Sequence, residues 1–250
     1  MPVTLKIPPR YIDGDRVMLP CHRTPGRYTM PIPVSLLADE ATALLVYREL
    51  GDGWERQERD LLDEVLGPAA VFVDVGAHWG IYTLHAATAG AAVIAIEPDP
   101  ANRSMLDAWL AANNLVERVT VVAAAVAEHA GTAYLRRNTS MGHVLVSEPP
   151  DPGATYDRGR FAGQPVYAPT PVVRLDDIPL PAGRPVVLKV DVEGGEIAVL
   201  RGAAALLGSG RVTHVVWEIN DAFDAVGRLL AEHGYRSVPL DSGNAVSTLG

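Results

Sequence analysis

The hydrophobic residues of this chain fall into short runs separated by stretches with helical periodicity. Five of the runs are continuous rather than alternating, as is typical of strands covered on both faces in a parallel sheet; they span residues 71–73, 93–96, 119–122, 186–190 and 214–217. Between them, apolar residues recur at helical spacing, as at Met105, Trp109 and Ala112. This repeated order of strand and helix predicts right-handed crossovers and a doubly wound α/β fold.

Residues 1–66 do not follow this alternation, and we predict that they form an N-terminal extension to a main domain at 67–250. Prolines within residues 1–35 exclude any long element there. Two helical patterns follow, at 36–45 and 54–66, and Gly67-Pro68 ends the second. We expect this helical extension to cap the substrate site.

Residues 132–178 also interrupt the alternation. They are predicted to form an insertion of short strands at 132–135, 143–146, 166–168 and 172–175. These strands surround a loop at 148–164 with three prolines and three glycines. A long loop in a compact domain is either functional or disordered, so this one is either a solvated insertion or a lid over a ligand.

Composition and charge disfavour several classes of protein. The 250 residues include 21 Lys and Arg against 30 Asp and Glu, and the resulting net charge of −9 disfavours a nucleic-acid partner. Cys21 is the single cysteine, which excludes an internal disulfide and a cysteine-cluster zinc site. The sequence shows no signal peptide, no apolar run long enough to span a bilayer and no basic amphipathic helix. We therefore expect a cytoplasmic protein that acts on a small molecule, away from membranes.

The first predicted strand leads into a glycine-containing loop, Asp74-Val75-Gly76-Ala77-His78-Trp79-Gly80. Gly76 and Gly80 permit a tight turn and a close approach to a ligand. The helix that follows offers unpaired N–H groups. Asp74, at the strand tip, would repel a pyrophosphate but attract an ammonium group. The loop also departs from the Gly-x-Gly-x-x-Gly pattern of dinucleotide sites.

The second strand ends in Glu97-Pro98-Asp99. A carboxylate about 20 residues beyond a glycine-rich turn is suited to bind both ribose hydroxyls. Sites for an ammonium group, a carboxylate and a diol together indicate S-adenosylmethionine rather than NAD. The alternatives are that each acid only caps a helix, as Asp99 does if a helix begins at Pro100, or that the chain is a nicotinamide-dependent oxidoreductase.

The last two strands of the series end in further acids. Lys189 lies inside the run 186–190, so we expect it to be partly buried and paired, with Glu196 in the next helix as its neutralising partner. Asp191 and Glu193 follow at the mouth of the site, and the run at 214–217 is followed by Glu218 and Asn220.

These motifs resemble those of the FkbM-type methyltransferases, within the class I S-adenosylmethionine-dependent enzymes. The resemblance is carried, in family order, by residues 74–83, 96–98 with Asn102, 124–126 with Gly131, 174–178, 188–196 and 200–203. It implies a Rossmann-like, seven-stranded, mostly parallel sheet whose last strand is antiparallel. It also implies methyl transfer to a hydroxyl of a small natural product or sugar. His78 stands where the family usually has Asn.

The resemblance also implies a set of cofactor-binding residues. By motif position, a methionine pocket is shaped by Asp74, Gly76 and Gly80, with His78 and Thr83 as polar contacts. Glu97, in the segment with Pro98, would bind the ribose. Ala124 would lie against the adenine, and Asp191 would face the amino end of the methionine.

Methyl transfer to an alcohol also needs a base. The candidates are Glu193 first, then His78, then Glu218. Asp191, Glu218 and Asn220 could instead offer oxygen ligands to Mg²⁺, although a metal is not expected. A non-catalytic S-adenosylmethionine-binding module is a further alternative. We expect residues 1–50 and 148–165 to select the acceptor.

Overall fold

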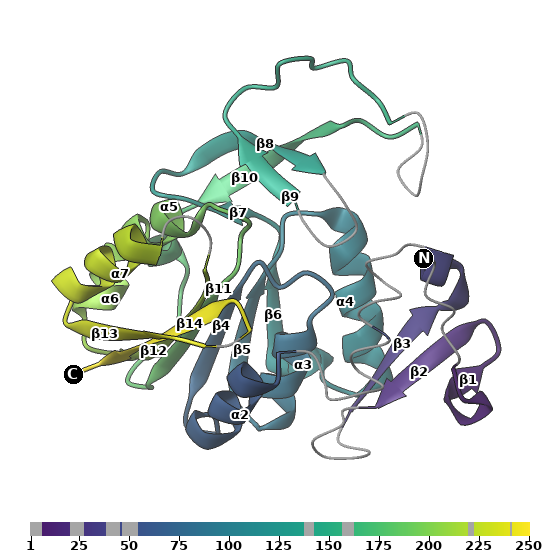
Figure 1. Ribbon diagram of the computed structural model, residues 1–250, viewed down its shortest axis with the longest axis horizontal. Coiled ribbons are helices and arrows are strands. Elements are labelled where there is room, and N and C mark those ends of the chain that lie inside the picture. The colour runs from purple at the N-terminus through teal and green to yellow at the C-terminus, as the bar shows by residue number, and fades with distance from the viewer. Residues whose placement is uncertain are drawn as a thin grey trace.

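A seven-stranded sheet forms the centre of the computed structural model, which describes residues 7–20, 28–38, 46, 55–137, 143–156, 163–219, 223–240 and 242–250 (Figure 1). The strand order is β13-β14-β12-β11-β4-β5-β6. The bounds are β4 (Val71–Val75), β5 (Ala92–Ile96), β6 (Val119–Val122), β11 (Val186–Val190), β12 (Val212–Glu218), β13 (Tyr235–Pro239) and β14 (Asn244–Leu249). Strands β12, β11, β4, β5 and β6 pair in parallel, whereas β14 is antiparallel to both of its neighbours. The predicted doubly wound sheet with an antiparallel last strand is confirmed.

Helices cover both faces of this sheet. On β4, Phe72 faces one core with α3 (Ile81–Thr88) and α4 (Pro100–Ala112), whereas Val71, Val73 and Val75 face the other. That second core includes α5 (Glu196–Arg201), α6 (Ala204–Gly208) and α7 (Phe223–Glu232). All five residues of β4 and of β11 are buried, which explains why each strand is apolar at every position but one, Asp74 in β4 and Lys189 in β11.

The N-terminus of α4 is capped by Asp99, as the sequence predicted. The Asp99 side chain accepts hydrogen bonds from the backbone nitrogens of Ala101 (2.7 Å) and Asn102 (3.1 Å), and Pro100 occupies the first helical position. Short 3₁₀ turns complete the helical elements: η1 (Pro9–Tyr11), η2 (Val34–Ala38), η3 (Val116–Arg118) and η4 (Leu175–Asp177). No helix within the described ranges is both long and apolar enough to span a lipid bilayer.

The N-terminal extension is not wholly helical, in contrast to the prediction from the sequence. It contains an antiparallel sheet of β1 (Ile12–Asp13), β2 (Arg16–Pro20) and β3 (Thr29–Pro33), which lies against α4. The alternating buried residues Val17, Leu19, Met30 and Ile32 form its inner face, a period of two that the prolines obscured.

The indole Nε1 of Trp109 in α4 donates to the carbonyl of Pro31 at 2.9 Å, which ties this sheet to the main domain. The helix α2 (Arg56–Val65) confirms the second helical pattern. Of the first pattern, at 36–45, only residues 36–38 are described, and they belong to η2.

The predicted insertion is a second, four-stranded sheet in the order β7-β10-β8-β9. Its strands are β7 (Ala125–Val126), β8 (Gly131–Arg137), β9 (His143–Val146) and β10 (Tyr167–Val173), and two of the predicted short strands merge into β10. Figure 1 shows this sheet above the ends of the central strands, beyond β11, β4 and β6.

Candidate functional site

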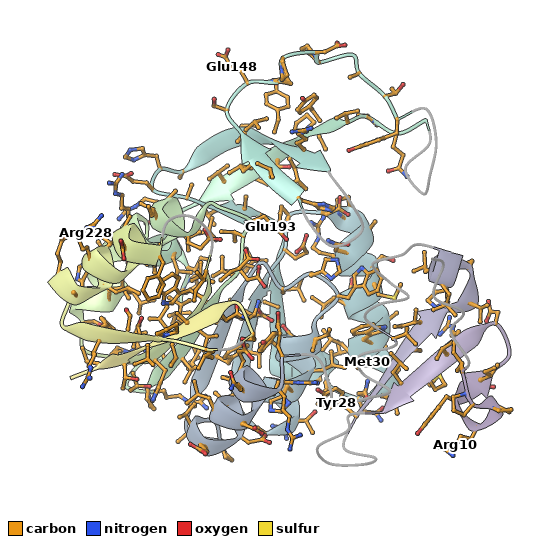
Figure 2. The ribbon with its side chains drawn as sticks, in the orientation of Figure 1. Arg10, Tyr28, Met30, Glu148, Glu193 and Arg228 are labelled. Carbon is orange, nitrogen blue, oxygen red and sulfur yellow. The ribbon has the colours of Figure 1, made fainter. Side chains whose placement is uncertain are left out.

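A cavity of about 370 Å³ opens at the carboxyl ends of the parallel strands, beneath the insertion sheet. Its walls come from the loop after β4, the ends of β5, β11 and β12, the segment at 124–127 and strands β8 and β9. Figure 2 shows Glu193 between the central strands and the insertion sheet. The position agrees with the rule that ligands of open α/β sheets bind at the carboxyl edge.

Two glycines of the loop after β4 are required by packing. Gly76 has a φ of +82° and Gly80 a φ of +95°. A Cβ on Gly76 would overlap the backbone carbonyl of Asp191, and one on Gly80 would overlap the side chain of Leu106. Both glycines line the cavity, but their close approaches are to β11 and α4, whereas the sequence led us to expect a close approach to a ligand.

Asp74 and Thr83 lie behind the cavity wall and are not among its lining residues. Asp74 is 1% exposed, and its Oδ2 accepts a hydrogen bond from the Thr83 hydroxyl at 2.7 Å. Burial raises the pKa of Asp74, and the nearby charge of Lys189 opposes that rise. The cavity lining therefore gives no support to direct contacts of Asp74 and Thr83 with the cofactor, and these contacts stay a prediction.

Lys189 is buried and paired, as predicted, but with a different partner. Its Nζ donates to Oδ2 of Asp191 at 2.9 Å and lies 4.6 Å from the ring centroid of Tyr82. Burial alone would lower the pKa of Lys189, but the carboxylates around it, Asp191 foremost, outweigh burial and raise it. Oε1 of the predicted partner, Glu196, instead accepts from the backbone nitrogens of Val192 (3.3 Å) and Gly194 (3.1 Å), in the loop before α5.

Glu97 is 4% exposed and lines the cavity beside Pro98. Its Oε2 accepts from the backbone nitrogen of His78 at 2.8 Å, and its Oε1 accepts from the Asp99 nitrogen (2.8 Å) and the Asn102 side chain (3.3 Å). Burial raises the pKa of Glu97 to about 7 despite these three bonds. Since a carboxylate offers about four acceptor positions, Glu97 keeps capacity for a ligand hydroxyl.

His78 lines the cavity with a φ of +53°, a left-handed conformation in which Asn, Asp and His are enriched. This shared tolerance explains how His stands where the related motif has Asn. The imidazole stacks on the indole of Trp79, with ring centroids 4.9 Å apart and an interplanar angle of 25°.

Two acids with shifted pKa values line the cavity at the strand ends. Burial, followed by repulsion from Asp191, raises the pKa of Glu193 to about 7 and that of Glu218 to about 8. Neither carboxylate accepts a hydrogen bond from any residue that the structure describes. Asp191 lines the cavity beside them, with Oδ2 engaged by Lys189.

The magnesium hypothesis gains no support from the arrangement of side chains. Within the described ranges, no three or more His, Cys, Asp or Glu side chains are grouped so as to hold a metal ion. Of the predicted ligands, Asp191 is paired with Lys189, and Asn220 lies outside the described residues.

The insertion contributes strands, not its long loop, to the cavity. Leu135, His143 and Leu145 line it opposite Ala124, whereas no described residue of the loop at 148–164 does. The Nε2 of His143 lies 3.6 Å from Oδ2 of Asp99. These lining residues were not predicted, because nothing in their spacing connects them to the motifs at the strand ends.

Glu55, in the N-terminal extension, is a further cavity residue that the sequence did not indicate. Among the described residues that precede β4, it alone lines the cavity. The expectation that the extension caps the site rests on this residue, because β1, β2 and β3 are absent from the lining.

Comparison with known proteins identifies the main domain. A family model described as the methyltransferase FkbM domain matches residues 74–237. Comparison with curated proteins gives no match.

Solved structures similar to the chain include an rRNA methylase from Streptococcus thermophilus, with 14% identity, a TM-score of 0.46 and coverage of 78% of this chain and 95% of that one. They also include a precorrin-6y C5,15-methyltransferase from Geobacter metallireducens GS-15, with 14% identity, a TM-score of 0.44 and coverage of 78% and 87%.

Proposed function

Because the chain belongs to the FkbM methyltransferase family and is an S-adenosylmethionine-dependent methyltransferase, we propose that it methylates a hydroxyl of a small molecule, a natural product or a sugar. The observation that carries the choice of a hydroxyl is the pair of carboxyls at the strand ends. Glu193 and Glu218 have pKa values of about 7 and 8, which suit the removal of a proton near neutral pH.

The residues around the cavity fit the cofactor. Glu97 keeps an acceptor position for a ribose hydroxyl, and Ala124 with Leu135 and Leu145 supplies apolar walls for a planar base. Carboxylates on the other wall balance a positively charged sulfonium. When bound, S-adenosylmethionine supplies an electrophilic methyl group.

Glu193 is the proposed general base. It lies in the loop after β11 and lines the cavity. No described residue donates a hydrogen bond to its carboxylate, so an acceptor hydroxyl can. Its pKa of about 7 makes it basic enough to take a proton while remaining largely ionised above neutral pH. His78 and then Glu218 are the next candidates.

The remaining contribution of the chain is positioning. Methyl transfer is an in-line displacement, so its rate depends strongly on how the reacting groups are held. The salt bridge from Lys189 fixes the Asp191 carboxylate, and the backbone of the same loop carries Glu193. This salt bridge therefore helps to fix the loop after β11 that positions Glu193.

A small acceptor agrees with the size and charge of the cavity. The cavity volume of about 370 Å³, which the cofactor and the acceptor would share, lies at the lower end of the range usual for small-molecule sites. The net charge of −9 and the acids of the cavity wall disfavour a phosphate-rich polymer.

The test is incubation of the purified protein with S-adenosylmethionine carrying an isotopically labelled methyl group and a pool of hydroxylated metabolites. Labelled products are identified by mass spectrometry, and the methylated atom by NMR. We expect an O-methyl product whose formation falls at least about tenfold in Glu193→Gln, the lower range for loss of a general base.

Glu64→Gln is the matched control, because Glu64 is exposed on α2 and outside the cavity. Labelled N-methyl or C-methyl products would contradict the choice of a hydroxyl. Cofactor binding without any labelled product would favour the non-catalytic module instead.

A further inference from the structure

One wall of the cavity comes from outside the main domain. Glu55 precedes the first turn of α2 and has a φ of +47°, a left-handed conformation that is uncommon for a residue with a side chain. This conformation turns the chain into α2 beside the cavity, where Glu55 is part of the lining.

One hydrogen bond holds the Glu55 side chain in a defined place. The Tyr82 hydroxyl donates to Oε2 of Glu55 at 2.6 Å. Burial raises the pKa of Glu55, and the nearby charge of Lys189 opposes that rise. Tyr82 belongs to the first turn of α3, just after the glycine loop, and Lys189 pairs in register with Asp74 of β4. Glu55 therefore lies beside the junction of β4 and β11.

The helix that carries Glu55 is itself anchored to the sheet. Glu58, fully buried one turn further along α2, accepts from the Asn244 side chain at 2.6 Å and from the Ser242 hydroxyl. Asn244 begins β14 and is the register partner of Glu218 in β12. The position of Glu55 is thus fixed from both sides, by α3 and by the end of β14.

The other carboxylates at the β4 side of the cavity have partners within the main domain. Asp74 lies behind the wall and bonds Thr83. Asp191 holds Lys189, and Glu97 accepts three hydrogen bonds from the main domain. Glu55 accepts one hydrogen bond among the described residues, from the neutral Tyr82 hydroxyl, so its Oε1 is available to a ligand. Asp191 differs in that its carboxylate already pairs with the cation of Lys189.

We infer that Glu55 binds the ammonium group of the amino-acid end of the cofactor, the role expected from the sequence for Asp74 and Asp191. A carboxylate is the natural partner of an ammonium group, and a charge-assisted hydrogen bond between the two is among the stronger ones. Tyr82 is then a positioning residue, because it holds the carboxylate without touching the ligand group. The inference rests on the cavity being the cofactor site, not on the identity of the acceptor.

The experiment compares two ligands by calorimetry on the intact chain. The first is S-adenosylhomocysteine, and the second is its deaminated analogue, which keeps the carboxylate and lacks only the ammonium group. The wild type should bind S-adenosylhomocysteine about 10- to 100-fold more tightly than the analogue, the range expected for a hydrogen bond to a charged group.

In Glu55→Gln this preference should be largely lost, while the affinity for the analogue stays unchanged. Glu64→Gln makes the same chemical change on the exposed side of the same helix and should keep the wild-type preference. Tyr82→Phe should reduce the preference in part, and it provides a second test if Glu55→Gln does not fold.

The outcomes distinguish the ammonium contact from the cofactor site as a whole. If both variants fold and keep the full preference for S-adenosylhomocysteine, Glu55 does not bind the ammonium group and the inference is wrong. An equal loss of affinity for both ligands would likewise overturn it, since that result indicates a merely structural role. A wild type that binds neither ligand would refute the cofactor site itself, whereas a failure to methylate hydroxyls leaves this measurement intact.

Discussion

Replacing Gly76 by alanine tests whether the loop after β4 is fixed by its contact with β11. The new methyl group would overlap the carbonyl oxygen of Asp191 and lie 3.0 Å from its carbonyl carbon. Neither atom can move alone, because the Asp191 nitrogen donates to the Val75 carbonyl at 3.0 Å and the Gly76 nitrogen donates to the Ile96 carbonyl at 3.0 Å. The substitution must therefore separate two paired strand ends.

The cost has two parts. An alanine at a φ of +82° is strained by about 1–2 kcal/mol, and overpacking against a backbone adds about 1–3 kcal/mol. In a chain of this size each kcal/mol lowers the Tm by about 2–4 °C. Gly183→Ala isolates the first part, because Gly183 has a φ of +69° and no atom lies within 4 Å of the position that its new methyl group would take.

The assay is thermal unfolding of both variants beside the wild type, with and without S-adenosylhomocysteine. We expect Gly76→Ala to melt below Gly183→Ala by about 2–12 °C, the effect of the overlap alone. It should also bind the ligand more weakly, because Asp191 and Glu193 move with the displaced β11 end. Equal melting temperatures for the two variants would refute the claim that packing on Asp191 requires this glycine.

Three further predictions follow from the charged groups. Glu97→Ala should weaken S-adenosylhomocysteine and its deaminated analogue alike, by about tenfold or more in calorimetry; a loss confined to one ligand would contradict a ribose contact. Glu193 and Glu218 have pKa values of about 7 and 8 in the folded chain, above the ordinary 4.5. Between these values the folded chain binds more protons than the unfolded chain, so the ligand-free protein should lose stability as pH rises from about 4.5 to 8. Tm measured against pH checks this, and Glu218→Gln should flatten the decline. Lys189→Met should cost about 3–5 kcal/mol in urea unfolding, because it leaves Asp191 and its neighbours without their cation; an unchanged midpoint would be inconsistent with that pairing.

The main domain was predictable because its signals are local. The run 186–190 is apolar at every position but Lys189, because both faces of β11 are buried. Asp99-Pro100 marks a helix start by its own capping chemistry. The N-terminal sheet was missed because its inner face alternates over only a few residues, among them Val17 and Leu19, between prolines that argue against strands.

The candidate site was predicted in outline but not in its contacts. Gly76, Glu97 and Glu193 line the cavity, as expected from their places at strand ends. Asp74 and Thr83, which share the same motif, turn into the interior instead. Spacing along the chain indicates which loop reaches the site, whereas the direction of each side chain depends on the elements packed against it.

The sequence by itself determined the fold class, the family and the edge of the sheet where the cavity opens, because each depends on residues adjacent in the chain. The tertiary structure decided which charges meet: Lys189 with Asp191 rather than Glu196, and Glu55 with Tyr82, from segments that the sequence does not connect. Burial makes an unpaired charge costly, so each buried side chain takes the partner that packing brings within reach. The partners come from segments far apart in the chain, so no local sequence pattern predicts these pairs.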